Sequence, residues 1–185
     1  NGVDLYDFEG YKVYRATDFE FNDAYNITDG DGNATFMEPY VQNGIPARWD
    51  LVNGKKGWHP IDLNGVKFYL GDDTGLVHSY VDNNVVNGQR YYYAVVSYDY
   101  GGDITNNIIP SDSPMRLRVH PLTGAIEMGP NVVEVVPSPP AAGYVEATFS
   151  GEKIDHVSGS SSGEIYLEIV DPASVKDNHD YRITF

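Results

Sequence analysis

The sequence of 185 residues contains no cysteine. Without a thiol the chain can form no disulfide, no thiolate nucleophile, no iron–sulfur cluster and no cysteine-bound zinc site. Bacterial secreted β proteins often have no cysteine, whereas a eukaryotic ectodomain of this size more often has some. The absence therefore favours a bacterial export product.

Basic residues and long apolar runs are also scarce. The 12 Lys and Arg stand against 27 Asp and Glu, which gives a formal net charge of -15. This charge repels phosphates and anionic lipid head groups, so it argues against nucleic-acid binding and against binding to a membrane surface. No stretch approaches the roughly 18 apolar residues that span a bilayer, so we expect no membrane insertion.

Helix-forming runs are hard to find, because Gly, Pro, Asn or Asp interrupts almost every window of about ten residues. The chain contains 15 Tyr, 7 Phe and 2 Trp, together with many Val and Ile. Aromatic and β-branched residues suit the pleated, half-buried surface of a sheet. The composition therefore predicts an all-β fold with little helix.

Alternating segments predict the strands of the first part of the chain. The strongest is 90–99, which has β-branched and aromatic residues on both faces, as expected for a central strand. The other expected strands are 11–15, 66–70, 78–82 and 115–119. The turn-rich stretch 18–33 predicts a long loop, and 41–57 predicts a hairpin or excursion.

A change of composition divides the chain into a domain 1–130 and a C-terminal β segment 131–185, which could be part of a second β domain. The segment opens with the β-rich residues 131–136 and the proline-rich break 137–140. Three alternating stretches beyond the break predict strands. They are 144–149, 164–170 and 181–185.

The order of these segments resembles the fibronectin type III family. Residues 8–15, Phe-Glu-Gly-Tyr-Lys-Val-Tyr-Arg, resemble its strand C, and 79–82 followed by 87–95 resemble its passage from strand E to strand F. Residues 110–113, Pro-Ser-Asp-Ser, resemble the bend that enters strand G. The resemblance implies an immunoglobulin-like sandwich in which the tyrosine of strand F packs in the core.

The resemblance covers roughly residues 8–120 and includes a long insertion at about 18–65. Strands A and B of the family should precede residue 8, and the chain has no room for them there. Their place would be taken either by Tyr144 to Phe185 folding back or by a strand from another chain. We favour the second arrangement, because the β-rich residues 131–136 precede a flexible break and could reach outward.

One loop carries a candidate calcium site. Asp29, Asp31 and Asn33 place oxygen ligands at alternate positions around Gly30 and Gly32. A loop of this kind can wrap a hard cation such as a structural calcium ion. Asx turns explain the same residues without a metal, because Asp and Asn side chains bond to the backbone two residues on.

Three aromatic residues in the long insertion form a candidate ligand site. Trp49, Trp58 and Tyr40 could provide flat faces on which a sugar ring stacks. The alternative is that they form the small core of an inserted loop.

No pattern predicts a catalytic residue, so we expect no enzyme. The five histidines show no metal-ligand spacing and are expected at the surface or in turns; they are His59, His78, His120, His156 and His179. Acidic residues are so numerous that a pair at glycosidase-like separation would carry no information.

The residues 70–76 and 135–137 are similar to stretches of large secreted surface proteins of Bacteroidetes-like bacteria. This resemblance implies a secreted protein, extracellular or at the cell surface. We therefore expect a non-catalytic structural or interaction module, namely a spacer, an adhesion element or a filament subunit. Its partners would be other chains or domains of the same assembly. The alternative is a carbohydrate-binding accessory module of a secreted enzyme, with a glycan as ligand.

Overall fold

The computed structural model describes residues 7–102, 107–148, 153–160, 162–176 and 178–184. The chain divides into two compact units, Asn1–Ser138 and Pro139–Phe185. The fold is all-β and sandwich-like, as predicted, with antiparallel sheets. Helix in the described part of the chain is limited to a 3₁₀ turn at Pro172–Ser174, and no helix there is long and apolar enough to cross a membrane.

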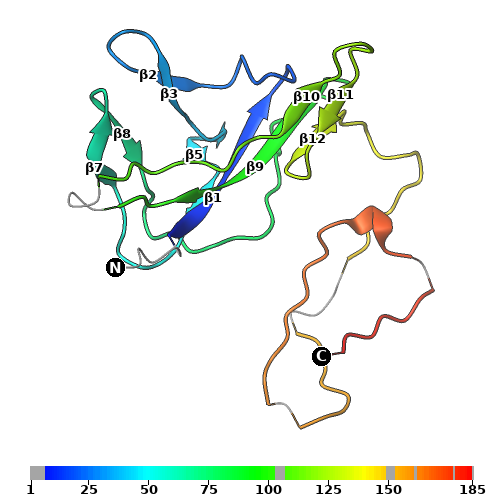
Figure 1. Cartoon of the computed structure of the whole chain (residues 1–185). Helices are drawn as coiled ribbons and strands as arrows, with labels where there is room; N and C mark the ends of the chain where they lie inside the picture. Colours follow the sequence, from blue (N-terminus) through cyan, green and yellow to red (C-terminus); the bar gives the residue numbers. More distant parts are fainter. Residues whose placement is uncertain (1–6, 103–106, 149–152, 161, 177, 185) are drawn as a thin grey trace. The chain divides into compact units, whose positions relative to one another are not determined.

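A four-stranded antiparallel sheet forms the centre of the first unit (Figure 1). The strands lie in the order β12-β9-β1-β6. Their bounds are Val132–Val135, Tyr91–Asp99, Phe8–Ala16 and Arg48–Asp50. The two long strands, β1 and β9, occupy the segments that the sequence marked most clearly, and they lie side by side in the middle of the sheet.

The pairing of β1 with β9 places the core on one face of the sheet. Their register runs from Phe8↔Asp99 to Ala16↔Tyr92, with an irregularity between Phe8 and Gly10. Side chains alternate across a strand, so the even-numbered residues of both strands share a face. From position 12 onward these residues are all buried, namely Lys12, Tyr14, Ala16, Tyr92, Ala94, Val96 and Tyr98.

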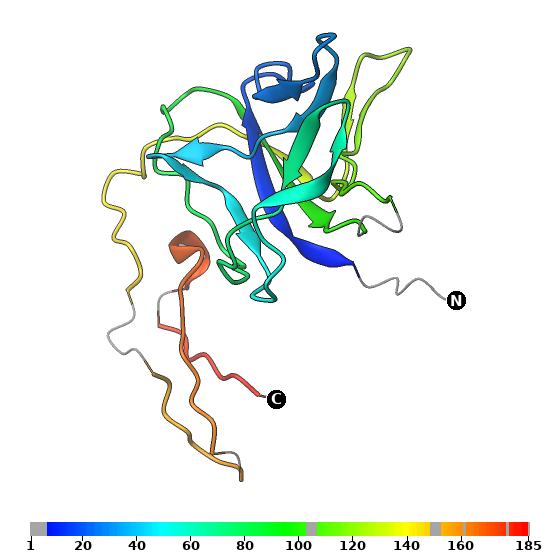
Figure 2. The same ribbon diagram turned by 90° about the vertical axis from the view of Figure 1, so that its left-hand side faces the viewer.

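Two hairpins cover this buried face (Figure 2). They are β2 with β3, at Asn26–Thr28 and Ala34–Met37, and β7 with β8, at Trp58–Leu63 and Val66–Tyr69. Phe36 of β3 meets Phe68 of β8 edge-on, with ring centroids 5.1 Å apart. Phe68 in turn packs against Tyr98 of β9. The second layer of the sandwich is therefore built from separate two-stranded sheets.

The opposite face of the sheet is crossed by the segment 80–86, which has no regular secondary structure. Asp82 anchors it, because its carboxylate accepts hydrogen bonds from Arg15 Nη1 of β1 and from Tyr93 Oη of β9, each at 2.8 Å. The strand predicted at 78–82 is therefore wrong. A strand needs a backbone ladder with a neighbour, and a side chain holds this segment instead.

Two separate stretches of chain lie along the same side of β9. Near one end of β9, Tyr98 forms an isolated bridge with Asp112, and Ser113 N–H donates to the carbonyl of Ser97 at 2.7 Å. Further along, β12 pairs with residues 91–94. Two segments that are not consecutive in sequence, 112–113 and β12, therefore lie one after the other along this edge of β9.

A hairpin of β10 and β11, at Leu117–Val119 and Ile126–Met128, separates these two stretches. Two sequence predictions were wrong here. Residues 115–119 do not form an edge partner of the main sheet, because β10 pairs with β11. Residues 131–136 do not reach outward, because β12 pairs with β9 and Val132 joins the core cluster.

The predicted insertion at about 18–65 is an integral part of the fold. It contains β6, which pairs with β1, and most of the second layer, including β7, which the sequence did not mark as a strand. Within 41–57, β4 and β5 form the expected small hairpin, at Val41–Gln42 and Ile45–Pro46.

The first unit ends inside the proline-rich break, at Ser138, rather than at the predicted boundary of 130. The reason is that β12 belongs to the main sheet and keeps residues 131–136 with the first unit.

The second unit contains none of the three expected strands in its described residues, which include 144–148, 164–170 and 181–184. Phe149 and Phe185 lie outside the described residues. Ile154 N–H donates to the carbonyl of Ile165 at 2.9 Å, but no strand pairing follows in the described part of the unit. An alternating pattern forms a strand only where a partner completes its backbone hydrogen bonds.

A buried carboxylate fixes the loop that follows β8. Asp50, fully buried at the end of β6, accepts hydrogen bonds from Thr74 Oγ1 at 2.6 Å and from the N–H groups of Asp73 and Thr74 at 2.6 and 3.0 Å. Burial by itself raises a carboxyl pKa, but these donors outweigh it and lower the pKa of Asp50. Gly71 is required beside it, because a Cβ there would lie 2.3 Å from Asp50 Cγ.

A second buried carboxylate, Glu9 of β1, accepts fewer hydrogen bonds than Asp50. Its Oε2 accepts a hydrogen bond from Asn53 Nδ2 at 3.0 Å, whereas its Oε1 has no partner among the described residues. Burial raises the pKa of Glu9, and the hydrogen bond from Asn53 and the charge of Lys55 only partly offset this. The ionised form of Glu9 is therefore destabilised in the folded protein.

We expect Glu9→Gln to stabilise the protein at pH 7. A raised carboxyl pKa means that the native state holds a proton that the unfolded chain releases, so ionisation of Glu9 lowers the unfolding free energy as pH rises. The substitution removes that charge, and the gain should be about 1 kcal/mol, the low end of what an unsatisfied buried polar group costs.

The measurement is urea unfolding at pH 7 and at pH 4, with the exposed Glu146→Gln as a matched loss of charge. The gain of Glu9→Gln should shrink at pH 4 and be absent in Glu146→Gln. A Glu9→Gln protein that is less stable than the parent at pH 7 would contradict the assignment.

Candidate functional site

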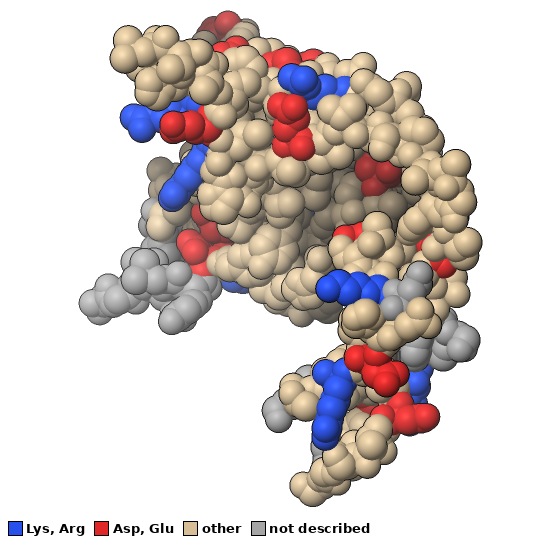
Figure 3. Space-filling model, turned by 90° about the vertical axis from the view of Figure 1, so that its right-hand side faces the viewer, with Lys and Arg blue, Asp and Glu red and all other residues tan. Residues whose placement is uncertain are grey.

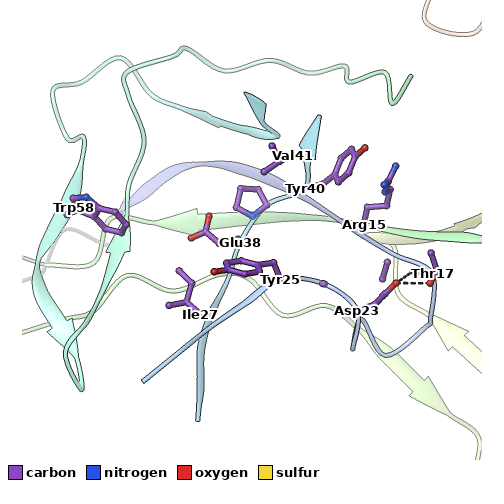
Figure 4. Close-up of a pocket in the computed structure, with 12 residues that line it drawn as sticks. Arg15, Thr17, Asp23, Tyr25, Ile27, Glu38, Tyr40, Val41 and Trp58 are labelled. Atoms are coloured by element: carbon purple, nitrogen blue, oxygen red, sulfur yellow. Dashed lines mark hydrogen bonds between the residues drawn. The ribbon is translucent and has the colours of Figure 1, made fainter. Parts of the chain in front are cut away.

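A groove of about 710 Å³ lies beside the C-terminal half of β1 (Figure 4). Its walls come from the end of β1, from the turn before β2, from the stretch after β3 and from the start of β7. The backbone joins two of these walls, because Glu38 N–H donates to the carbonyl of Tyr25 at 2.9 Å. Figure 4 shows the lining running from Trp58 past Glu38 and Tyr25 toward Arg15.

Exposed aromatic side chains stand along this groove. Tyr25 is 72% exposed and Trp58 is 60% exposed, although both belong to a unit with a packed core. Trp58 is held by an edge-on contact with Tyr69, with ring centroids 4.9 Å apart. Large aromatic rings held in water by a rigid scaffold are a common feature of binding surfaces.

The charged residues of the groove differ in whether other residues of the chain already bind them. Asp23 Oδ2 accepts hydrogen bonds from the N–H and the Oγ1 of Thr17, at 2.8 and 2.7 Å. Arg15 is bound to Asp82, and its guanidinium lies over the ring of Tyr40, 3.8 Å from the centroid. Glu38 is different, because its carboxylate accepts no hydrogen bond within the described residues. Among the described residues of the groove, Glu38 therefore presents a carboxylate without a hydrogen bond between two exposed aromatic rings.

No protein-family model, curated protein or solved structure matches the chain. The function must therefore be argued from the geometry of the site.

The structure brings together two of the three predicted aromatic ligands. Tyr40 and Trp58 both line the groove. Trp49 lies elsewhere, opposite Tyr11 in the pairing of β6 with β1, and its ring packs on Tyr80 with centroids 5.3 Å apart. Trp49 is thus held by a neighbouring aromatic ring. Whether Tyr40 and Trp58 bind a ligand stays a prediction.

The candidate calcium loop forms the tip of the β2–β3 hairpin. Asp29 Oδ1 accepts hydrogen bonds from the backbone N–H groups of Asp31 and Asn33, at 3.0 and 2.9 Å. Its Oδ2 accepts from the side chains of Asn33 and Asn64. Hydrogen bonds from Asn33 lower the pKa of Asp29, and the bond from its backbone N–H has a larger effect than the bond from its side chain.

This is the geometry of an Asx turn, in which backbone and amide donors occupy the carboxylate. Among the described residues no group of three or more His, Cys, Asp or Glu side chains could hold a metal ion. The structure therefore favours the turn, and calcium binding stays an untested prediction.

One histidine differs from expectation. His59 of β7 is buried, and its Nε2 lies 2.8 Å from the carbonyl oxygen of Gly102. The expectation of a surface or turn position is therefore wrong for His59, which packs inside the first unit and ties β7 to the loop that follows β9.

Charged side chains of one sign form no large patch on the face shown in Figure 3. There the described Asp and Glu side chains lie interspersed with Lys and Arg. The Asp and Glu side chains therefore form no single acidic patch on this face.

Sequence reasoning missed Tyr25 and Glu38 as residues of the groove. The available signal was Tyr25, a large aromatic residue in the otherwise polar stretch 18–33. Nothing in the local pattern marks Glu38, because it reaches the groove only when β3 pairs with β2.

We expect Asp29→Ala to lower the unfolding free energy by about 1–2 kcal/mol, since it removes several hydrogen bonds that close the hairpin tip. The loss should be the same in calcium and in chelator.

Asp31→Ala is the control, because Asp31 contributes only its backbone N–H to the turn. This substitution should change the unfolding free energy by no more than about 0.5 kcal/mol. Thermal unfolding measures both variants, and a calcium-dependent rise in melting temperature that Asp29→Ala abolishes would favour the metal.

Proposed function

We propose that the chain is a fibronectin type III-like, non-catalytic interaction module of a secreted or cell-surface protein, serving as a spacer, an adhesion element or a filament subunit. The order of the main sheet supports the fold assignment. β1 and β9, the segments that resemble strands C and F, are neighbours, and residues 112–113 and β12 lie on the far side of β9, where strand G of such sandwiches pairs.

The observation that carries the binding role is the groove beside β1. Tyr25 and Trp58 are exposed although the same unit has a buried core, and Trp58 is held by its edge-on contact with Tyr69. Aromatic residues of this kind are enriched at the centres of interfaces, because they offer a large contact area at a small cost in conformational entropy.

The non-catalytic role is tested by turnover. We expect the chain to hydrolyse nothing in a panel of polysaccharides and peptides, and Glu38→Gln and Asp23→Asn to leave that result unchanged. Hydrolysis by the parent that Glu38→Gln abolishes would show that the free carboxylate of the groove is catalytic, and the proposal would then fail.

The second candidate function is carbohydrate binding at the same groove, which two features favour. The exposed faces of Tyr25 and Trp58 can stack on the apolar face of a sugar ring. The carboxylate of Glu38, which lies between them in Figure 4, can accept hydrogen bonds from sugar hydroxyls. A glycan that spans both rings would use this carboxylate to fix its orientation.

We expect Trp58→Ala to weaken binding of a retained polysaccharide about thirty-fold, equivalent to about 2 kcal/mol for a central aromatic contact. Affinity gel electrophoresis against a panel of soluble polysaccharides provides the measurement. Tyr144→Ala, an exposed tyrosine in the second unit, serves as the control and should bind as the parent does. Equal retention of the parent and of Trp58→Ala on every polysaccharide would refute carbohydrate binding at the groove without affecting the broader proposal.

A further inference from the structure

A lysine lies inside the core of the first unit. Lys12, from the middle of β1, points into the buried face of the sheet and is 3% exposed. Its Nζ lies over two aromatic rings, 3.9 Å from the centroid of Phe68 and 4.9 Å from that of Tyr98. Lysine is almost never fully buried unless it is paired, so this position requires a partner.

The partner is Asp112, whose Oδ1 lies 2.9 Å from Lys12 Nζ. The backbone bridge between Asp112 and Tyr98 fixes the aspartate beside β9. Its other oxygen, Oδ2, accepts a hydrogen bond from the hydroxyl of Tyr14 at 2.5 Å. One carboxyl group is therefore held between an amine on one side and a phenol donor on the other.

This environment favours the neutral form of Lys12. Desolvation, the largest influence on Lys12, lowers the pKa of its ammonium group despite the nearby Asp112 charge. A buried ion pair also loses hydration that its mutual attraction only partly restores. Transfer of a proton from Lys12 to Asp112 gives a neutral amine, which is a nucleophile, in contact with a neutral carboxylic acid.

We infer that Lys12 and Asp112 form an intramolecular isopeptide bond, which covalently joins β1 to the stretch of chain beside β9. The close contact, the surrounding aromatic rings and the Tyr14 hydroxyl provide the three requirements of such a condensation. These are proximity, exclusion of water and a donor for the carbonyl oxygen.

The reaction needs no further reactant. Lys12 Nζ attacks Cγ of the protonated Asp112, and the hydroxyl of Tyr14 stabilises the negative charge that develops on Oδ2. Oδ1 takes a second proton from the nitrogen and leaves as water when the Cγ–Oδ1 bond breaks. The ammonium and carboxylate of the starting pair thus become one amide and one water molecule. Asp112 is 20% exposed, which gives the water a route to solvent.

The bond would replace the buried charge of Lys12 and the partly buried charge of Asp112 by a neutral amide, and its two ends lie on segments 100 residues apart in sequence. A cross-link that closes so long a loop restricts the unfolded chain strongly. The first unit would then resist complete unfolding even in strong denaturant.

Intact-mass spectrometry of the purified chain under denaturing conditions tests the inference. We expect the parent mass to be lower than the sequence mass by one water molecule, and a tryptic digest to contain a branched peptide joining Lys12 to Asp112. Lys12→Arg retains a positive charge but has no nucleophilic amine, so it should show its full sequence mass. Asp112→Ala should do the same.

The inference stands if the loss of water occurs in the parent and is absent in Lys12→Arg. It is overturned if the parent, incubated folded for several days between pH 5 and pH 8, keeps its full sequence mass. A loss of water that persists in Lys12→Arg would also overturn it, because the bond would then lie elsewhere. Both results are independent of what the groove binds.

Discussion

The antiparallel ladder between β1 and β9 is the constraint on which the first unit depends. It brings residues 8–16 to residues 92–99 across most of the unit's sequence, and it forms the centre of the main sheet. β6 and β12 extend the ladder at its two edges, and the hairpins of the second layer pack on its even-numbered face. The groove also depends on the ladder, because Arg15, Ala16 and Thr17 reach it from the end of β1.

Several charged residues lie in the interior of this unit. Glu9, Lys12 and Asp50 are all buried, and each is matched differently. Asp50 is surrounded by N–H and hydroxyl donors, Lys12 meets a carboxylate and aromatic rings, and Glu9 has one oxygen without a partner. Buried polar groups are costly unless they are satisfied, but those that are satisfied restrict which segments can pack together. The hydrogen bonds of Asp50 thereby fix the loop at 71–75 beside β6, and the ion pair of Lys12 fixes residue 112 beside β1.

The sequence predicted the two longest strands and missed several others, including β7 and β11. β1 and β9 were recognised because each has a long run of β-branched and aromatic residues that forms a strand in almost any sheet. β7 was missed because Pro60 and a buried histidine interrupt its pattern, and β11 is only three residues long. The segments near 80, 145 and 165 alternate equally well and form no strand in their described residues. Alternation records which face a residue would occupy, whereas pairing depends on a partner that local sequence does not reveal.

The same limit applied to the candidate sites. Trp58 and Tyr40 could be proposed from the sequence because they are aromatic. The position of Glu38 in the groove depends on the β2–β3 hairpin. The Lys12–Asp112 contact joins residues 100 positions apart, so only the tertiary structure reveals it. Asp29, Asp31 and Asn33 could be read locally, and both interpretations of them were visible in the sequence. The structure adds the directions of the N–H groups, which show the Asx turn, whereas calcium binding stays a prediction.

The interrupted edge beside β9 bears on how such a module can vary. Residues 112–113 and β12 both contact β9. The β10–β11 hairpin lies between them in sequence, so the chain is attached to the edge of the main sheet before and after the hairpin. Only the base of this hairpin contributes to the core, through Met115 and Leu117, and its tip at 121–125 is exposed. The length of the tip can therefore change without shifting the register of any strand in the main sheet, since longer surface loops cost little free energy. It is a natural point for a foreign peptide or a whole domain to be grafted.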